Sequence, residues 1–158
     1  YATLVNGGYK IKPTLIRKNK NYLKKEQLIS RETSIHIRNI LRKVVSTKEG
    51  TAEFADIEGY QIAGKTGTAE KAIEGKYSSD KKINTFVSFF PYKNPKHLLI
   101  VILDEPKPAP NYIYTFRHLN NYKSSGYKKN TAGWNSALIA GKIIEKIGPI
   151  LATKYDVN

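Results

Sequence analysis

Residues 59–69 read Gly-Tyr-Gln-Ile-Ala-Gly-Lys-Thr-Gly-Thr-Ala, the densest cluster of glycine, threonine and lysine in the chain. If this stretch is a strand edge facing a ligand, Lys65 supplies a fixed positive charge. The hydroxyls of Thr66 and Thr68 can then hydrogen-bond a carboxylate. Gly67 has no side chain, so a substrate backbone can approach the strand closely. The stretch therefore predicts a strand that binds an acidic ligand.

A nucleotide site is the first alternative, because Gly59 to Thr66 also satisfies the phosphate-loop pattern G-x-x-x-x-G-K-[ST]. Leu98–Asp104 resembles the apolar strand ending in aspartate that helps to hold magnesium in such proteins. A phosphate loop, however, needs small residues and a helix that begins directly after it. Bulky Tyr60 and Ile62 occupy the variable positions, and Gly67 weakens a helix start. The pattern therefore favours the strand over the phosphate loop.

The segment before this stretch predicts a helix from Ser30 to about Ser46. Ser30 is a good N-cap, and Glu32 lies in the first turn, where the helix dipole favours an acid. Apolar residues recur with the spacing of one buried helix face, at Ile37, Ile40, Leu41, Val44 and Val45. Further upstream, Tyr1–Asn6 is typical of a last helical turn closed by Gly7-Gly8. Ile11–Ile16 is a short extended segment whose Pro13 suits only an edge.

Three strands are predicted downstream, and their short connections favour an antiparallel meander. They are Tyr60–Thr66, Thr85–Phe90 and Leu98–Leu103. The third is wholly apolar, which predicts a central strand buried on both faces. Glu105 to Asn130 is expected to be a long surface loop, and Thr131 to about Gly148 a helix stopped by Gly148-Pro149. Grouped strands and helices predict an α+β fold with helices packed against the sheet.

Composition limits the classes of function. The 158 residues suffice for one domain. The sequence contains no run of about 18 apolar residues, so no membrane span is predicted. The chain has no cysteine, and His36, His97 and His118 lack metal-ligand spacing, so no metal or cofactor is expected.

The net charge is +14, from 27 basic and 13 acidic residues, with acid-free basic stretches at 1–25 and 106–144. One interpretation is a basic module that binds nucleic acid or another polyanion. The other is a bias in composition, because lysine far outnumbers arginine and offers little bidentate recognition of bases or phosphates. We favour the second, and therefore expect no nucleic-acid partner.

The motifs together resemble the class B penicillin-binding proteins. Gly64–Ala69 resembles their K-T-G element, and Gly50-Thr51-Ala52 precedes it as in the family. The opening residues, Tyr-Ala-Thr-Leu-Val-Asn-Gly-Gly, match the helix end and turn upstream of that site. Leu103–Pro106 and Thr131-Ala132-Gly133-Trp134 look like the last strand and C-terminal helix of the septal member. The resemblance runs from Tyr1 to about Leu151 and implies the last three strands of the transpeptidase sheet.

The resemblance also implies a chemistry. Those enzymes acylate a serine with a peptidoglycan stem peptide ending in D-Ala-D-Ala, and a second stem then takes the acyl group. Lys65 would contribute positive potential to the catalytic network. Thr66, Gly67 and Thr68 would bind the carboxylate end of the substrate or of a β-lactam, and the Thr68 N–H would donate to the oxyanion.

No residue in this chain is expected to be the nucleophile. Ser78 to Lys82 and Ser125 to Lys128 satisfy S-x-x-K, but both follow the K-T-G and are expected to lie in polar loops, and no S-x-N occurs. We expect residues 1–158 to be the C-terminal portion of a transpeptidase domain. Such an incomplete domain would be inactive alone. The whole protein would work at the periplasmic face of the inner membrane, with cell-division proteins as partners.

Overall fold

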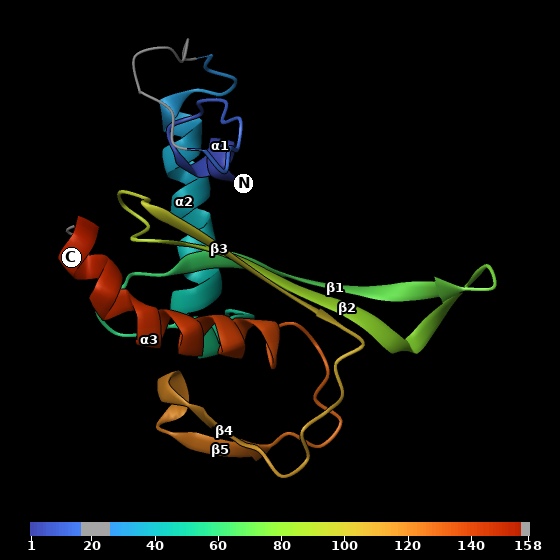
Figure 1. Ribbon diagram of the computed structural model, residues 1–158. Helices are drawn as coiled ribbons and strands as arrows, with labels where there is room; N and C mark the ends of the chain where they lie inside the picture. The colour runs from blue at the N-terminus through green and yellow to red at the C-terminus, as the bar shows by residue number, and fades with distance from the viewer. Residues whose placement is uncertain (17–25, 156–158) are drawn as a thin grey trace.

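The computed structural model describes residues 1–16 and 26–155, so part of the basic stretch at 1–25 lies outside the described residues. The elements follow one another along the chain as shown in Figure 1. They are α1 (Ala2–Val5), α2 (Arg31–Ser46), the 3₁₀ turn η2 (Glu53–Ala55), β1 (Ala63–Ile73), β2 (Lys76–Phe90), β3 (His97–Asp104), β4 (Ile113–Phe116), the 3₁₀ turn η3 (Arg117–Leu119), β5 (Tyr122–Ser125) and α3 (Ser136–Tyr155).

An antiparallel sheet in the order β1-β2-β3 forms the centre of the molecule, as the meander prediction required. Lys65 of β1 pairs with Val87 of β2, which in turn pairs with Ile100 of β3. β1 begins at Ala63 rather than Tyr60, because the backbone turns first: φ is +87° at Gly59 and +48° at Gln61. The predicted α+β class is confirmed.

β1 and β2 extend well past the predicted strands into a hairpin that projects from the sheet (Figure 1). Its turn places Glu74 at φ +50° and Gly75 at φ +78°, and two successive positive φ values are typical of tight hairpin turns. The sequence did not reveal this hairpin, because residues 69–82 are mostly polar and their pairing depends on backbone hydrogen bonds. The motif Ser78–Lys81 therefore lies in a strand, not in a loop.

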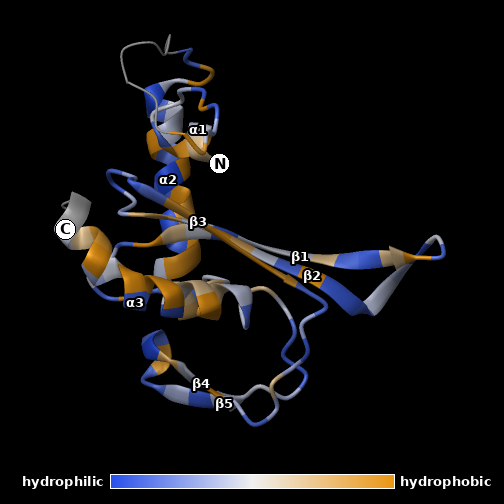
Figure 2. Cartoon of the chain, viewed as in Figure 1, coloured by the Kyte–Doolittle hydropathy of each residue, from blue (hydrophilic) through white to orange (hydrophobic). Residues whose placement is uncertain are grey.

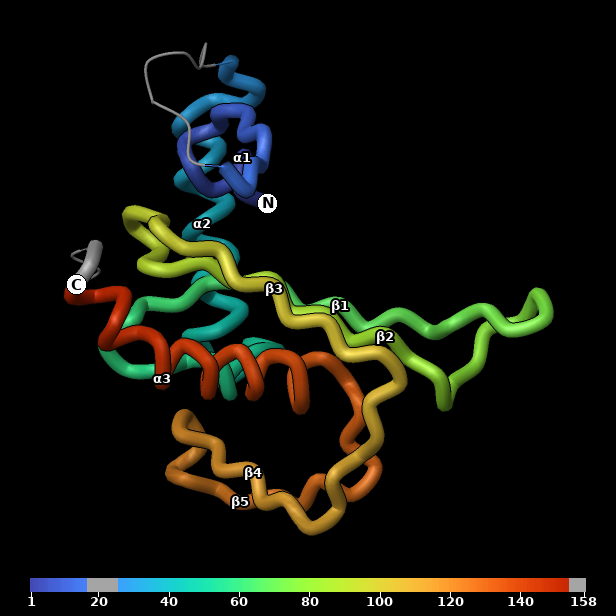
Figure 3. Tube along the Cα trace, viewed as in Figure 1, coloured from blue at the N-terminus to red at the C-terminus, as the bar shows by residue number. Residues whose placement is uncertain are grey.

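Helices cover the two faces of the sheet at the end away from the projecting β1–β2 hairpin, as the tube in Figure 3 shows. Phe86 and Phe90 of β2 point to one side, where they pack in a cluster with Ile144 of α3. Phe89 points to the other side, where it packs with Leu41 of α2. Because strand side chains alternate between faces, one short aromatic run in β2 supplies both layers of the core.

α2 matches the predicted helix. The Thr33 N–H donates to Ser30 Oγ at 3.0 Å, which confirms the N-cap. Leu41 and Val45 are buried as predicted, but Ile40 is 63% exposed. α1 and the positive φ values of Gly7 and Gly8 are also confirmed. Residues 11–16 form no strand.

The predicted bounds of α3 are wrong at both ends, because it begins at Ser136 and continues through Pro149. Before it, the Ala132 N–H donates to Thr68 Oγ1 at 3.0 Å, which holds residues 131–134 in a turn against β1. Proline removes one helical hydrogen bond, but packing on both sides of it sustains the helix. The ring of Tyr60 lies against Gly148, and Leu151 packs on the core.

β3 is an edge strand of the described sheet, so the prediction of a central strand buried on both faces is wrong for this chain. Alternate side chains on one face are exposed: Leu98 by 42%, Ile100 by 50% and Ile102 by 62%. Figure 2 shows β3 largely in orange, the hydrophobic end of the colour scale, at the edge of the sheet. A wholly apolar strand can thus lack a cover among the residues that the structure describes, because periodicity reports hydrophobicity and not the neighbour that buries the strand.

Residues 105–130 contain the β4–β5 hairpin and η3, so they are more ordered than the predicted long surface loop. Tyr114 is only 4% exposed, and burial raises the pKa of its hydroxyl. Its ring packs edge-on against Trp134, with centroids 4.8 Å apart. The hairpin is thereby fastened to the turn that precedes α3. Among the described residues, no helix combines the length and apolarity needed to cross a membrane.

Candidate functional site

Residues 64–68 lie in the regular part of β1, with β2 on one side. β1 is the first strand in the sheet order, so its other edge has no partner strand among residues 1–16 and 26–155. After Thr66 the strand continues to Ile73, and no helix begins there. A phosphate loop needs a helix start at that point, so the geometry of Gly59 to Thr66 contradicts the nucleotide alternative.

The predicted site residues Lys65, Thr66, Gly67 and Thr68 alternate between the two faces of β1. Thr66 pairs with Phe86, whose side chain points toward α3, while Lys65 pairs with Val87, whose side chain points the other way. Lys65 is exposed, and its Nζ donates to the carbonyl oxygen of Thr66 at 2.8 Å. The ammonium thus stays at the strand edge, where it can meet an anion.

Both threonine hydroxyls contact groups from other segments. Thr66 Oγ1 lies 2.9 Å from Thr51 Oγ1, in the loop after α2. Thr68 Oγ1 accepts the Ala132 N–H at 3.0 Å. The structure therefore brings together Thr66, Thr68, Thr51 and the turn before α3. The sequence singled out the segments of Thr51 and Ala132 only as family motifs, without a role for either residue.

A cavity of about 340 Å³ opens beside these hydroxyls. Thr66 and Thr68 line it together with Lys48 and several aromatic rings. Glu53 also lines it, and its carboxylate accepts the His118 backbone N–H at 3.1 Å. Those rings belong to Phe54, Phe116 and Trp134. Only the tertiary fold assembles this lining, because the residues come from four separate segments of the chain. A second cavity, of about 350 Å³ between η2, β4 and α3, contains none of the predicted site residues.

The two glycines of the motif have different surroundings. A Cβ at Gly64 would lie 2.5 Å from the Val87 carbonyl oxygen and 2.7 Å from the Phe86 ring. A Cβ at Gly67 would meet nothing closer than 3.9 Å, and the φ of Gly67 is not positive. Packing within the chain therefore requires glycine at 64 but not at 67. Gly67 leaves the strand surface bare where a ligand can approach.

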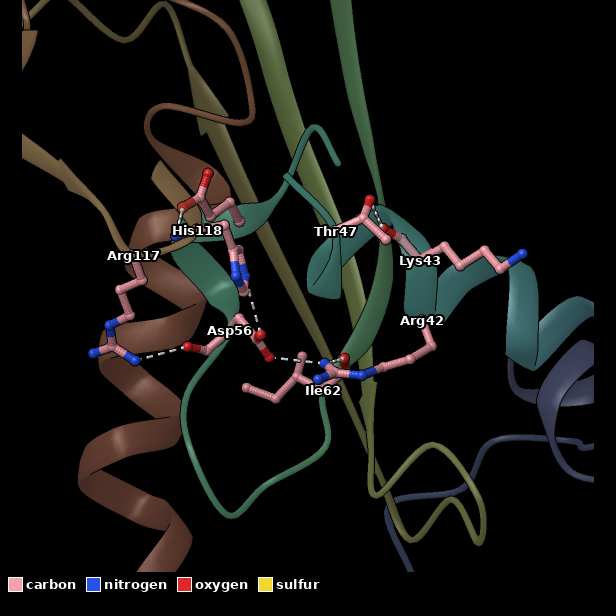
Figure 4. A network of polar contacts seen from close by, with 8 residues as sticks. Arg42, Lys43, Thr47, Asp56, Ile62, Arg117 and His118 are labelled. Carbon is pink, nitrogen blue, oxygen red and sulfur yellow. Dashed lines mark hydrogen bonds and ion pairs between the residues drawn. The ribbon is translucent and has the colours of Figure 1, made fainter. Parts of the chain in front are cut away.

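A polar network fixes the segment that follows Thr51, and Figure 4 shows it from close by. Arg42 of α2 donates to Asp56 Oδ1 at 2.8 Å and also to the carbonyl of Ile62. Arg117 Nη1 donates to the Asp56 carbonyl at 3.0 Å, and His118 Nε2 lies 3.6 Å from Asp56 Oδ2. Asp56 thus links α2 and η3 to the loop before β1.

The remaining motifs do not join the site. Ser125 donates its hydroxyl to the Pro110 carbonyl at 3.0 Å, and Ser78 lies in the projecting part of β2. His36 lies 3.9 Å from Glu32, while His118 contacts Asp56. Within the described ranges, no group of three or more acidic, histidine or cysteine side chains could hold a metal.

Fold and site together define a class: an α+β domain whose edge strand presents lysine, glycine and two threonines beside a cavity. Residues 1–133 match the family described as "Penicillin binding protein transpeptidase domain". The chain belongs to this family.

Among its relatives, the probable peptidoglycan D,D-transpeptidase FtsI of Caulobacter vibrioides is 34% identical over 161 residues, covering 96% of this chain and 25% of that protein. Stage V sporulation protein D of Bacillus subtilis is 39% identical over 117 residues, covering 67% of this chain and 18% of that protein. This chain thus spans about a quarter or less of the length of these relatives.

The fold also recurs in a solved structure. The TP domain of penicillin-binding protein 3 from Burkholderia pseudomallei, in its apo form, has a TM-score of 0.73 and 24% sequence identity to this chain. The match covers 98% of this chain and 40% of that one. At this level of identity the likeness shows the fold, and it confirms the predicted part of the transpeptidase sheet.

Proposed function

We propose that this chain supplies the K-T-G strand of a peptidoglycan D,D-transpeptidase, which cross-links stem peptides by acyl transfer. The observation that carries the proposal is the geometry of residues 64–68. They form an extended edge strand with an exposed lysine, and the two threonines line a cavity. Family membership and the transpeptidase relatives support the same activity.

In this proposal the strand binds the acidic end of the substrate. Lys65 attracts the carboxylate and adds positive potential to the catalytic network. The hydroxyls of Thr66 and Thr68 donate to that carboxylate, whose oxygens can only accept hydrogen bonds when ionised. Gly67 lets the peptide lie against the strand. The Thr68 N–H is assigned to the oxyanion that forms on acylation.

The serine nucleophile and its lysine lie outside this chain in the proposed assignment. The S-x-x-K matches within the chain lie away from the described site: Ser78 is in the projecting hairpin, and Ser125 bonds Pro110. The chain alone is therefore expected to be inactive. The K-T-G strand becomes functional when the part of the protein that carries the serine lies against it.

Labelling with a fluorescent penicillin tests the proposal. The isolated chain should form no covalent adduct, whereas the full-length gene product should form one. In the full-length protein, Lys65→Ala and Thr68→Ala should each reduce the labelling rate by at least about tenfold, since each removes a group aimed at the developing or bound charge. Unchanged labelling in both variants would remove these residues from the site.

The cellular setting is part of the proposal. We place the reaction in septal wall synthesis, at the periplasmic face of the inner membrane, with β-lactams as inhibitors and cell-division proteins as partners. The septal assignment is supported by residues 131–134, Thr-Ala-Gly-Trp, which resemble the septal member of the family. The Caulobacter relative, a probable peptidoglycan D,D-transpeptidase, aligns with nearly the whole chain. The sporulation relative from Bacillus matches a smaller share of the chain at slightly higher identity. Depletion of the protein distinguishes a septal role from a role in sporulation. A septal role predicts filamentous cells during growth.

A further inference from the structure

The hydroxyl of Thr68 has a defined hydrogen-bond polarity. A backbone N–H can only donate, so the Ala132 N–H, 3.0 Å away, uses a lone pair of Thr68 Oγ1. The hydroxyl hydrogen of Thr68 therefore points elsewhere. Because Thr68 is exposed and lines the cavity beside β1, that hydrogen can be donated to a ligand. The turn before α3 thus makes Thr68 a donor.

Thr66 has a similar contact, but with a hydroxyl instead of an amide. Thr51 Oγ1 and Thr66 Oγ1 lie 2.9 Å apart, and either can donate to the other. If Thr51 donates, the Thr66 hydrogen becomes available to a ligand, as for Thr68. Hydrogen bonds arranged in series polarise one another, so the second hydroxyl then becomes the better donor.

The two segments that carry these supporting groups pack against each other. A Cβ at Gly133 would lie 2.2 Å from the Thr51 carbonyl oxygen, so the loop of Thr51 packs directly on the turn that holds Ala132. Only glycine permits this approach. The loop after α2 and the turn before α3 therefore act together behind β1, and both threonine hydroxyls depend on one joint arrangement.

We propose that Thr51 is a positioning residue for the carboxylate of the substrate. Its hydroxyl donates to Thr66 Oγ1, while the Ala132 N–H donates to Thr68 Oγ1, so both threonines of the strand present hydrogens to an acceptor. An ionised carboxylate has acceptors only, so two aligned donors suit it. This inference rests on the proposed function, because it assigns the ligand of the same strand.

The test compares two ligands that differ only in the carboxylate: benzylpenicillin and its methyl ester. Acylation rate constants are measured in the full-length gene product with Thr51→Val, which keeps the shape and removes the hydroxyl. Loss of one neutral hydrogen bond corresponds to about a threefold to tenfold slower reaction with benzylpenicillin. The ester should react at a rate within about twofold of the unaltered protein, because it lacks the ionised acceptor.

Matched variants separate positioning from structure. Thr51→Ser keeps the hydroxyl and should restore the preference for the carboxylate. Thr47→Val removes a comparable hydroxyl, which donates to the Lys43 carbonyl at 2.8 Å. Thr47 does not line the cavity, so this substitution should leave both rates unchanged. If valine prevents folding, Thr51→Ala compared with Thr51→Ser makes the same measurement.

Two results would overturn the inference: an equal loss with both ligands, which marks a structural role, or no loss with benzylpenicillin. A failure of the proposed function gives a different pattern. In that case Lys65→Ala and Thr68→Ala would also react normally, whereas a failure confined to Thr51 would leave those two variants impaired.

Discussion

The ring of Phe86 in β2 occupies the space that a side chain at position 64 of β1 would need. The two residues lie on neighbouring strands, and Phe86 is fully buried in the cluster shared with α3. This contact sets the distance between the start of β1 and the aromatic core. The position of the K-T-G strand therefore depends on the absence of a Cβ just before Lys65.

Gly64→Ala and Gly67→Ala form a matched pair of variants. At position 64 the added methyl group clashes with backbone and ring atoms, so the free energy of unfolding should fall by about 1–3 kcal/mol. At position 67 there is room within the chain, so stability should change by less than about 1 kcal/mol. Thermal unfolding of the full-length gene product measures both.

The rate of penicillin acylation by the folded protein should be lowered more by Gly67→Ala than by Gly64→Ala. Gly67→Ala should slow it, because the methyl group stands where the ligand approaches the strand. A Gly67→Ala protein that is stable and reacts normally would contradict the proposed approach of the substrate to β1.

Lys71 should make the stability of the hairpin depend on pH. Its Nζ lies 2.8 Å from Glu105 Oε1 and 2.9 Å from Asp104 Oδ1. The hydrogen bond from Lys71 lowers the pKa of Glu105 below its ordinary 4.5, and the hydrogen bonds to Glu105 and Asp104 raise the pKa of Lys71 above its ordinary 10.5.

The Glu105 contribution is thus present above about pH 4.5 and lost as the pH falls through its lowered pKa. The Lys71 contribution is present below about pH 10.5 and lost as the pH rises through its raised pKa. The protection of the amides of residues 69–73 and 76–83 against hydrogen exchange, measured relative to the intrinsic exchange rate at each pH, should therefore be greatest between these limits. Glu105→Gln should flatten the acid side of the profile. If the decrease in amide protection at acid pH were the same in Glu105→Gln, the ion pair of Lys71 with Glu105 would not stabilise the hairpin.

Asp56→Asn should destabilise the protein through the network of Figure 4. Arg42 and Asp56 are only 22% and 18% exposed, and hydrogen bonds to charged groups contribute about 1.5–3 kcal/mol. We expect a loss of that size in thermal unfolding. Glu26→Gln is the control, because its pair with Lys10 is 57% and 59% exposed and should contribute less than about 1 kcal/mol. Equal effects of the two substitutions would argue against a special role for Asp56.

Ile100→Lys should reduce self-association of the isolated chain. β3 has an edge without a partner strand among the described residues, and it exposes the side chains of Leu98, Ile100 and Ile102. This combination promotes aggregation. Light scattering of the isolated chain should fall with the lysine. Ile40→Lys, which alters an exposed isoleucine of α2, is the control and should change the scattering less.

The same Ile100→Lys substitution should lower the melting temperature of the full-length protein, if residues outside this chain cover β3 there. Full-length protein that tolerates the lysine without loss of stability would show that this face stays uncovered.

The sequence by itself determined the local elements and the motif. The Ser30 cap, the apolar run of Leu98–Leu103 and the aromatic run of Thr85–Phe90 each define an element through short-range chemistry, and all three elements are present. The lysine, glycine and threonines of 65–68 indicated a ligand-binding strand, because their side chains suit a carboxylate. They lie in the regular strand β1, and their binding of a ligand remains a prediction.

Only the tertiary structure decided what surrounds these elements. The long hairpin depends on backbone pairing that polar residues do not reveal, and α3 passes Pro149 because Tyr60 and Leu151 pack beside it. The contact of Thr51 with Thr66 joins residues 15 positions apart, and that of Ala132 with Thr68 joins residues 64 positions apart. Periodicity and caps act within a few residues of the chain, whereas these contacts arise when separate segments pack on one sheet.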